Sequence, residues 1–219
     1  MSKVTRFSVF AGAMLALTGA AQATLVNRGG GMIYDNTRNI TWLADMNYAK
    51  TSGYDSDGQM TWFAATTWAS DLVYGGFNDW HLPTLNSSDA SCTGGFVGAG
   101  YNCTRGELSG LFVTDLGNKA GESVLNQAGD TAEQIANLAL FSNVQSFGYW
   151  SGTEYAPSPA FAWFFGTDLG DQNFDFKGNT LYAVAVRPGD VAASVPEPQT
   201  LALVLLALGA TVVARRRPH

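Results

Sequence analysis

The chain has 219 residues, of which 46% are hydrophobic, and its 18 acidic residues outnumber its 12 Lys and Arg to give a net charge of −6. This length and composition support a folded core. The acidic balance excludes DNA, RNA and anionic lipid as general partners, because phosphate binding needs clustered Lys and Arg.

The first 23 residues have the three parts of an export signal. Lys3 and Arg6 precede an apolar run at 7–17, and residues 21–23, Ala-Gln-Ala, form a small-x-small cleavage site. The apolar run is too short to span a bilayer, so a signal peptide is favoured over an N-terminal anchor. We therefore expect residues 1–23 to be removed by cleavage before Thr24.

The first part of the exported chain predicts a β-hairpin. Short apolar runs at 32–34 and 40–43 flank a polar turn, and runs bounded in this way are typical of strands. The polar loop at 50–58 contains an Asp-x-Asp-Gly sequence, residues 55–58. It lacks the remaining ligands of an EF-hand, so a solvated acidic turn is favoured over a calcium site.

A helix is predicted at 61–74, where Trp and Ala recur at spacings of three and four residues after a capping threonine. Trp80 and Leu82 then alternate with His81 in an extended segment, which places His81 on the outer face. His81 is the only histidine between residues 24 and 199, and the sequence contains no Gly-x-Ser-x-Gly elbow, His-Glu-x-x-His helix or phosphate-binding glycine loop. The sequence therefore predicts a protein that is not an enzyme.

A loop rich in Gly, Ser and Asn, residues 85–105, contains the two cysteines of the chain, Cys92 and Cys103. Because the chain is exported, we expect these cysteines to form a disulfide. A reactive cysteine is the alternative, but Arg105 is the only nearby basic residue that could lower its pKa.

The second half of the chain predicts helices followed by an antiparallel meander. Thr104 is expected to cap an amphipathic helix that runs to Leu116, and a helical turn is expected near 132–138. Between 147 and 188, short aromatic and β-branched runs separated by Gly, Pro, Asn and Asp predict about four strands. The expected fold class is therefore α+β, with two helices packed on antiparallel sheets and with long loops.

Residues 191–219 combine three features of a sorting signal. They are a Pro-Glu-Pro triplet, an apolar run at 201–214 and an arginine cluster, that is, Pro196, Glu197, Pro198, Arg215, Arg216 and Arg217. This order resembles the PEP-CTERM sorting signal of Gram-negative bacteria, which implies an exosortase as the processing partner. A plain C-terminal anchor is the alternative, because the apolar run alone fits one. In either case the protein contacts the membrane only through this segment.

Both end segments are basic, so their removal makes the protein more acidic. Between residues 24 and 199 there are seven Lys and Arg and 18 Asp and Glu, which gives a net charge of −11. Residues 24–190 are expected to form one globular domain. Its charge disfavours nucleic acid and sulfated polysaccharide as ligands.

The domain resembles the Lcl-type C-terminal domain family over residues 30–189. The resemblance is carried by three blocks: Asp35-Asn36-Thr37 with Trp42; residues 78–84, Asn-Asp-Trp-His-Leu-Pro-Thr; and residues 149–154, Tyr-Trp-Ser-Gly-Thr-Glu, through 185–188, Ala-Val-Arg-Pro. It implies a C-type-lectin-like fold and exposure on the cell surface. The family includes a bacterial adhesin domain that binds sulfated glycosaminoglycans, a ligand class that the charge of this chain argues against.

These features together predict an exported surface or matrix protein that binds carbohydrate, such as the exopolysaccharide of the cell. Aromatic faces stack on sugar rings, and acidic and amide side chains bind hydroxyl groups. The candidate ligand-binding residues are Trp150, Glu154, Tyr155 and Trp163. Calcium is the one cofactor left open, with candidate ligands Asp168, Asp171, Asn173 and Asp175. An ordinary acidic turn, and core packing of the tryptophans, are the alternatives at these positions.

A structural matrix protein without specific sugar binding is the alternative function. It would contact other surface proteins through its loops. In both cases we expect the protein in the cell envelope, on the outer surface or outside the cell, after transient anchoring in the inner membrane.

Overall fold

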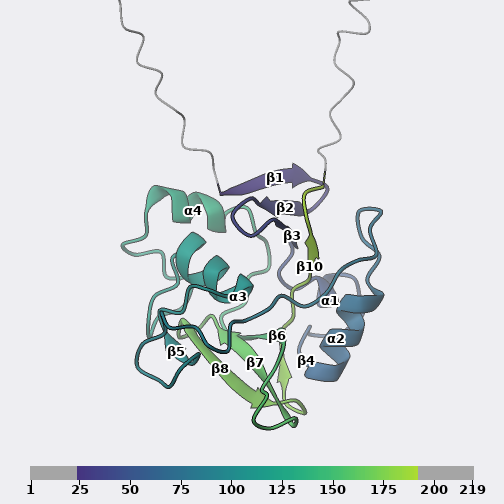
Figure 1. Ribbon diagram of the computed structural model, residues 1–219. Coiled ribbons are helices and arrows are strands. Elements are labelled where there is room, and N and C mark those ends of the chain that lie inside the picture. Colours follow the sequence, from purple (N-terminus) through teal and green to yellow (C-terminus); the bar gives the residue numbers. More distant parts are fainter. Residues whose placement is uncertain (1–23, 192–219) are drawn as a thin grey trace, which may run out of the picture.

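An antiparallel sheet joins the two ends of the domain. The computed structural model describes residues 24–191, so the predicted signal peptide and apolar tail lie outside the described residues. The first sheet has the order β1-β2-β3-β10, with bounds Leu25–Gly29, Met32–Asp35, Ile40–Leu43 and Val186–Pro188. Figure 1 shows both ends of the described part of the chain at this sheet, where Arg28 Nε donates to Asp190 Oδ1 at 2.8 Å. The predicted hairpin of β2 and β3 is confirmed.

A second antiparallel sheet occupies the opposite end of the molecule (Figure 1). Its order is β5-β8-β7-β6, with bounds Gly100–Tyr101, Asp171–Phe176, Phe161–Gly166 and Gly148–Glu154. A short ribbon pairs β4 with β9, bounds Met60–Thr61 and Thr180–Leu181. The predicted meander is therefore real for three strands, β6, β7 and β8.

The prediction of a fourth strand in the meander is wrong, because the chain leaves the second sheet after Phe176. It pairs with β4 for two residues and then crosses to the first sheet, where Val186 lies opposite Trp42. Ala183, Val184 and Ala185 on the way are at most 1% exposed. Small and β-branched side chains allow this crossing segment to be buried on both faces, so its sequence does not reveal which sheet it joins.

The helices pack beside and between the sheets, and they agree with the sequence in part. Their bounds are Tyr48–Thr51 for α1, Trp62–Asp71 for α2, Glu107–Ser109 for α3 and Ala132–Leu138 for α4, with a π-helical stretch, Gly110–Asp115, after α3. Thr61 Oγ1 accepts a hydrogen bond from Ala64 N and caps α2, as predicted. The helix ends before Leu72 because Tyr74 and Phe77 then pair across a glycine turn.

The cap predicted for the second helix is wrong. Gly106 occupies the N-cap position of α3, and the backbone N–H of Thr104 donates instead to Asp89. Glu107 accepts from Thr84 N at 2.7 Å and so ties α3 to the preceding extended segment. The helical turn predicted near 132–138 is confirmed as α4.

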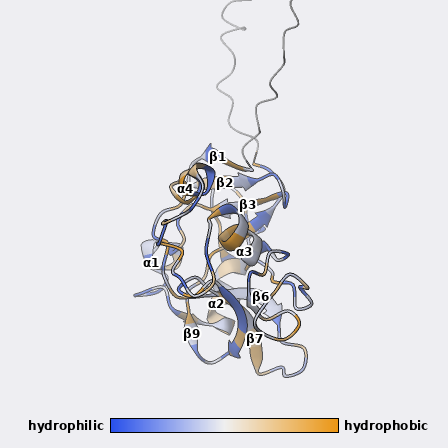
Figure 2. Cartoon of the chain, turned by 90° about the vertical axis from the view of Figure 1, so that its left-hand side faces the viewer, coloured by the Kyte–Doolittle hydropathy of each residue, from blue (hydrophilic) through white to orange (hydrophobic). Residues whose placement is uncertain are grey.

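The core lies between the two sheets and is strongly aromatic. Phe112 stacks on Phe165 with ring centroids 5.4 Å apart, and Trp150 is fully buried with Nε1 donating to Met60 O at 2.8 Å. Figure 2 shows an orange, hydrophobic helical segment beside the α3 label, near the centre of the molecule. Burial of large rings provides most of the apolar stabilisation here, and the indole hydrogen bond removes the cost of burying that polar group.

Over the described residues, the mixed helices and antiparallel sheets, with 18% helix and 29% strand, are compatible with the predicted α+β class, and the C-type-lectin-like assignment stays a prediction. Over residues 24–191 the helices are too short or too polar to cross a lipid bilayer. The apolar run predicted to do so, 201–214, lies beyond these residues.

Candidate ligand-binding groove

Two adjoining cavities form a polar groove on the side of the domain that carries α1. The first has a volume of about 380 Å³ and is lined by Asn47, Lys50, Thr51, Asp57, Asn143, Gln145 and Tyr182. The second has a volume of about 230 Å³ and is lined by Gln59, Gln145, Ser146, Phe147 and Tyr182. The two cavities share Gln145 and Tyr182. We call these residues together the amide groove, because four of the lining side chains are amides.

The walls of the amide groove come from two loops that hydrogen-bond to each other. Met46 N donates to Ser142 O and Ser142 N donates to Ala44 O, which joins the loop before α1 to the loop before β6. Asp45 Oδ1 accepts from both Asn47 N and Asn143 Nδ2, each at 2.9 Å. One carboxylate therefore positions an amide residue on each wall.

Tyr182 lines both cavities of the amide groove. Its backbone is held by β6, because Tyr182 N donates to Gly148 O and Trp150 N donates to Tyr182 O. The ring packs against Tyr149 and Phe147, with centroids 5.8 Å and 6.3 Å away. Phe147 is 43% exposed and lines the second cavity, so the lining there has two aromatic rings in contact.

The acidic turn beside the amide groove is closed by its own backbone. Asp55 Oδ1 accepts from Asp57 N and Gly58 N, and Asp57 Oδ1 accepts from Gln59 N. Desolvation acts to raise the pKa of Asp55, but these hydrogen bonds outweigh it and lower the pKa below its ordinary value. The geometry agrees with the solvated turn that the sequence favours over a calcium loop.

Two of the four sequence-predicted ligand-binding residues lie in the core. Trp150 is 0% exposed and Trp163 is 2% exposed, so neither ring face can stack on a sugar, and this corrects their assignment to a binding surface. The sequence could not separate the two roles, because an aromatic residue on a strand has the same pattern on either face of a sheet.

The other two predicted ligand-binding residues lie near the end of β6, outside the lining of the amide groove. Glu154 is exposed and pairs with Lys177 at 2.7 Å. Tyr155 is half-buried and stacks on Phe174 with centroids 3.9 Å apart. Tyr155 belongs to an exposed aromatic face that also includes Phe96, Phe161 and Phe176.

The predicted calcium ligands are not gathered around one point. Asp171 and Asp175 are four positions apart on β8, which at about 3.3 Å per residue separates them by roughly 13 Å. Asp175 Oδ1 instead accepts from Phe176 N and Asn179 Nδ2. Asp171 interacts with Asp168 and Asn173: desolvation and then the Asp168 charge raise the pKa of Asp171, and the hydrogen bond with Asn173 acts to lower it. The four residues therefore do not form one ligand set.

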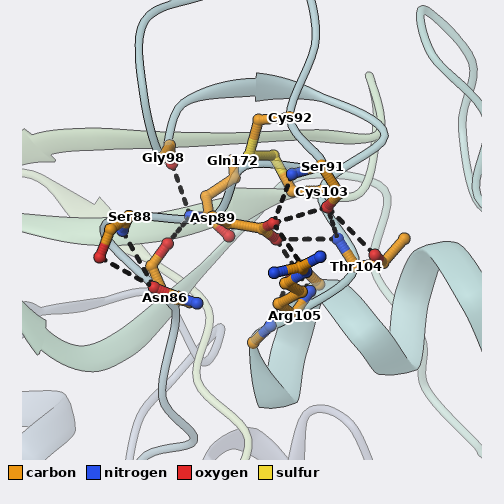
Figure 3. Close-up of polar contacts among 12 residues, drawn as sticks. Asn86, Ser88, Asp89, Ser91, Cys92, Gly98, Cys103, Thr104, Arg105 and Gln172 are labelled. Atoms are coloured by element: carbon orange, nitrogen blue, oxygen red, sulfur yellow. Dashed lines mark hydrogen bonds and ion pairs between the residues drawn. A yellow bond between two sulfur atoms is a disulfide. The ribbon is translucent and has the colours of Figure 1, made fainter.

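The loop at 86–105, which we call the Asp89 loop, contains the predicted disulfide between Cys92 and Cys103. Figure 3 shows the carboxylate of Asp89 surrounded by donors from the same loop. It accepts from Ser91 N and Oγ, Thr104 N and Arg105 N, and the residue is 1% exposed. Desolvation acts to raise the pKa of Asp89, but the hydrogen bonds from Ser91, Arg105 and Thr104 hold it below its usual value.

Asp89 and the two cysteines are the one group of three candidate metal-ligating side chains that the described part of the chain brings within 4.8 Å. The two sulfur atoms are bonded to each other and provide no thiolate, and the carboxylate oxygens are occupied by N–H and O–H donors. We conclude that this cluster closes the loop and has a structural role.

His81 occupies a structural position as well. It pairs with Val186 through two backbone hydrogen bonds of 2.8 and 2.9 Å, and its Nδ1 lies 3.4 Å from Asp79 O. Asp79 in turn receives two hydrogen bonds from Arg187, whose guanidinium lies 3.9 Å from the ring centroid of Phe77. The segment around His81 is therefore part of the link between the extended segment and the first sheet.

Comparison with known families identifies the end of the chain. Residues 194–217 match the PEP-CTERM protein-sorting motif. The match contains the predicted Pro-Glu-Pro triplet and arginine cluster, and it lies outside the described residues. The protein is thus exported, processed by an exosortase and transiently anchored in the membrane. A search of curated proteins finds no match to the chain. The likeness of residues 30–189 to the Lcl-type family rests on its short motifs alone.

Sequence reasoning missed the amide groove. Its lining comes from residues near 47–59, 143–147 and 182, and no spacing in the sequence connects these segments. Asn and Gln in loops are also ordinary turn residues, so their types carry no signal of a binding site. Asn143 shows this overlap, because it adopts a positive φ of 53° and lines the groove at the same time.

Proposed function

We propose that this exosortase-processed protein is a non-enzymatic carbohydrate-binding protein of the cell envelope or its matrix, and that it holds a sugar in the amide groove. The observation that carries the proposal is the lining of the groove. Side-chain amides, hydroxyls and an aromatic ring converge on two adjoining cavities, the first of about 380 Å³, which lies in the usual range for small-ligand sites.

The chemistry of the lining suits a sugar better than an apolar ligand. The amide oxygens of Asn143 and Gln145 can accept hydrogen bonds from hydroxyl groups, and the ring of Tyr182 can stack on the C–H face of a pyranose. Export, with processing at the sorting motif, supports a role among extracellular polysaccharides.

The lining of the amide groove also supports binding without turnover. Glycoside hydrolysis uses a pair of carboxyl groups on either side of the scissile bond, and Asp57 is the one carboxylate that lines these two cavities. Lys50 has no histidine or cysteine beside it in the lining with which to form a nucleophile–base pair.

A structural matrix role without sugar binding is the second candidate, and the exposed aromatic face favours it. Phe96 and Phe176 are 53% and 50% exposed beside Tyr155, Phe161 and Phe174. An apolar patch of this kind fits contacts with other proteins.

The test is a binding screen of the exported protein against oligosaccharides and exopolysaccharide, with calcium and with a chelator. We expect saturable binding that the chelator leaves unchanged. Tyr182→Ala should weaken it about fivefold, because stacking contributes on the order of 1 kcal/mol beyond the buried area. Tyr34→Ala, which removes a half-buried tyrosine from β2, is the matched control and should bind normally.

Thermal unfolding of both variants shows whether they are folded. Absence of binding under either condition would sink the carbohydrate proposal and leave the structural role. Binding that disappears with the chelator would show that a cation is part of the site.

A further inference from the structure

We infer that the amide groove selects sugars that donate hydrogen bonds and carry no negative charge, that is, neutral hexoses or amino sugars, and discriminates against uronic acids and sulfated or phosphorylated sugars. This inference rests on the proposed function and specifies its ligand class. It follows from which hydrogen-bonding atoms of the groove are already used by the protein.

Three amide NH₂ groups of the groove donate hydrogen bonds within the protein. Asn47 Nδ2 donates to Asp57 O at 3.1 Å, Asn143 Nδ2 to Asp45 Oδ1 at 2.9 Å, and Gln145 Nε2 to Asn143 O at 2.7 Å. These three partners are backbone carbonyl or carboxylate oxygens, which can only accept, and Asn143 Nδ2 donates in addition to Thr51 Oγ1 at 3.4 Å. These partners fix the orientation of all three amides, since a flipped amide would place two acceptors against each other.

The carbonyl oxygens of these amides remain without donors. Within residues 24–191, no group donates a hydrogen bond to Asn47 Oδ1, and the residue is only 4% exposed. This oxygen is itself buried beside Gly58, so a ligand in the groove cannot reach it. Asn143 is exposed and Gln145 is half-buried, and their NH₂ groups donate within the protein while their carbonyl oxygens accept no hydrogen bond in the described part of the chain. The groove therefore offers the carbonyl oxygens of Asn143 and Gln145 as acceptors to a ligand.

The charges around the groove also disfavour a negatively charged ligand. Asp57 lines the first cavity and Asp45 lies directly behind Asn143, whereas Lys50 is the one cation in the lining and is exposed. A carboxylate or sulfate on the ligand would face carbonyl oxygens and carboxylates of the same polarity. A hydroxyl or ammonium group meets acceptors instead.

Free acceptors could also hold a metal ion, but this groove is poorly suited to calcium. Calcium takes six to eight oxygen ligands, commonly from several carboxylates. The lining has a single carboxylate, Asp57, one of whose oxygens already accepts from Gln59 N. A polyhydroxylated ligand matches dispersed amide carbonyls better.

The experiment measures affinities of the exported protein for tetrasaccharides of three kinds: neutral hexoses (glucose, mannose and galactose), glucosamine, and mannuronate. Calorimetry is run with and without chelator. We expect at least one neutral or amino sugar to bind at least tenfold more tightly than the uronate, with no effect of the chelator.

Gln145→Lys reverses the polarity at the centre of the groove by replacing an acceptor with a cation. It should weaken the neutral and amino sugars about tenfold, the loss of roughly one hydrogen bond with its donor, and strengthen the uronate. Gln127→Lys makes the same charge change at an exposed loop position and is the matched control.

The outcomes separate the two claims. Uronate binding as tight as that of neutral sugars, weakened by Tyr182→Ala, would overturn the inference and leave carbohydrate binding in the groove intact. An equal change of sugar preference in the Gln145→Lys and Gln127→Lys variants would also overturn the inference. No sugar binding at all would remove the proposed function itself.

Discussion

The Asp89 loop and the amide groove are both clusters of polar side chains in loops. They differ in whether the protein itself provides all the hydrogen-bond partners of these side chains. In the Asp89 loop, N–H and O–H groups of the loop donate hydrogen bonds to both oxygens of the Asp89 carboxylate. In the amide groove, the NH₂ groups of Asn143 and Gln145 donate within the protein, and their accessible carbonyl oxygens have no donor in the described structure. A satisfied cluster stabilises the fold, whereas an unsatisfied one beside a cavity retains capacity for a ligand.

One atom of the Asp89 loop region does not fit this division at first sight. Gln172 donates from Nε2 to Asn86 O and Gly98 O, and its Oε1 is buried without a donor. The residue is 0% exposed, so a ligand cannot reach this oxygen without opening the loop. Access, together with free capacity, therefore distinguishes the groove from the loop.

The largest expected effect is the loss of stability on substituting Asp89. Asp89→Ala leaves the N–H groups of Ser91, Thr104 and Arg105 without their acceptor, and should lower the free energy of unfolding by roughly 4 kcal/mol. Asp89→Asn retains one acceptor oxygen and should lose about half as much. Urea unfolding measures both. Asp71→Ala, at an exposed position, is the control and should stay within about 0.5 kcal/mol of the wild type. Equal stabilities of the Asp89→Ala and Asp71→Ala variants would contradict a structural role for Asp89.

The disulfide should have the next largest effect. Cys92 and Cys103 are separated by 11 positions, and opening a loop of this size costs about 3 kcal/mol in the chain-entropy model. A Cys92→Ala, Cys103→Ala double variant should therefore unfold at lower urea concentration while keeping its sugar affinity. Loss of affinity in a variant shown to be folded by circular dichroism would show that the two regions are coupled.

The pH dependence of the two regions should differ. The folded-state pKa of Asp89 lies below its unfolded value of about 3.9, so its stabilising contribution is present above that pH and is lost as the pH falls through the folded-state pKa. The wild type should lose more stability than Asp89→Asn on acidification below about pH 4. The amides of the groove do not titrate, so sugar affinity should stay constant between pH 5 and 8. An affinity that changes tenfold over this range would mean that a titrating group contacts the ligand.

The smallest expected effect is that of Gln145→Ala on stability. The residue is only half-buried and its carbonyl oxygen has no partner in the described structure, so the free energy of unfolding should change by less than about 0.5 kcal/mol. Sugar affinity should fall severalfold in the same variant. A variant that is strongly destabilised, with unchanged affinity when folded, would place Gln145 among the structural residues.

Sequence reasoning succeeds here where a feature is local. The β2–β3 hairpin, the Thr61 cap of α2, the disulfide and the sorting motif each lie within a short segment whose residue types specify them. It fails where distant segments meet. The crossing from Leu181 to Val186 depends on two sheets at once, and the groove depends on three separated loops.

The candidate residues on β6 to β8 show a second limit. Alternation along a strand indicates that two faces exist, but it does not say which face is covered by the rest of the chain. Trp150 and Trp163 lie on covered faces, whereas the exposed Phe176 was not singled out. Similarly, Asp171 and Asp175 are close in sequence but roughly 13 Å apart once the segment is extended.

The most direct test of the account is an NMR titration of the ¹⁵N-labelled exported protein with a neutral tetrasaccharide, following the side-chain NH₂ signals of Asn and Gln. The account predicts saturable shifts for Asn47, Asn143 and Gln145 in the groove, and none for Gln172 in the Asp89 loop region. Shifts confined to the aromatic face around Tyr155 and Phe176, or no shifts at saturating sugar, would contradict it.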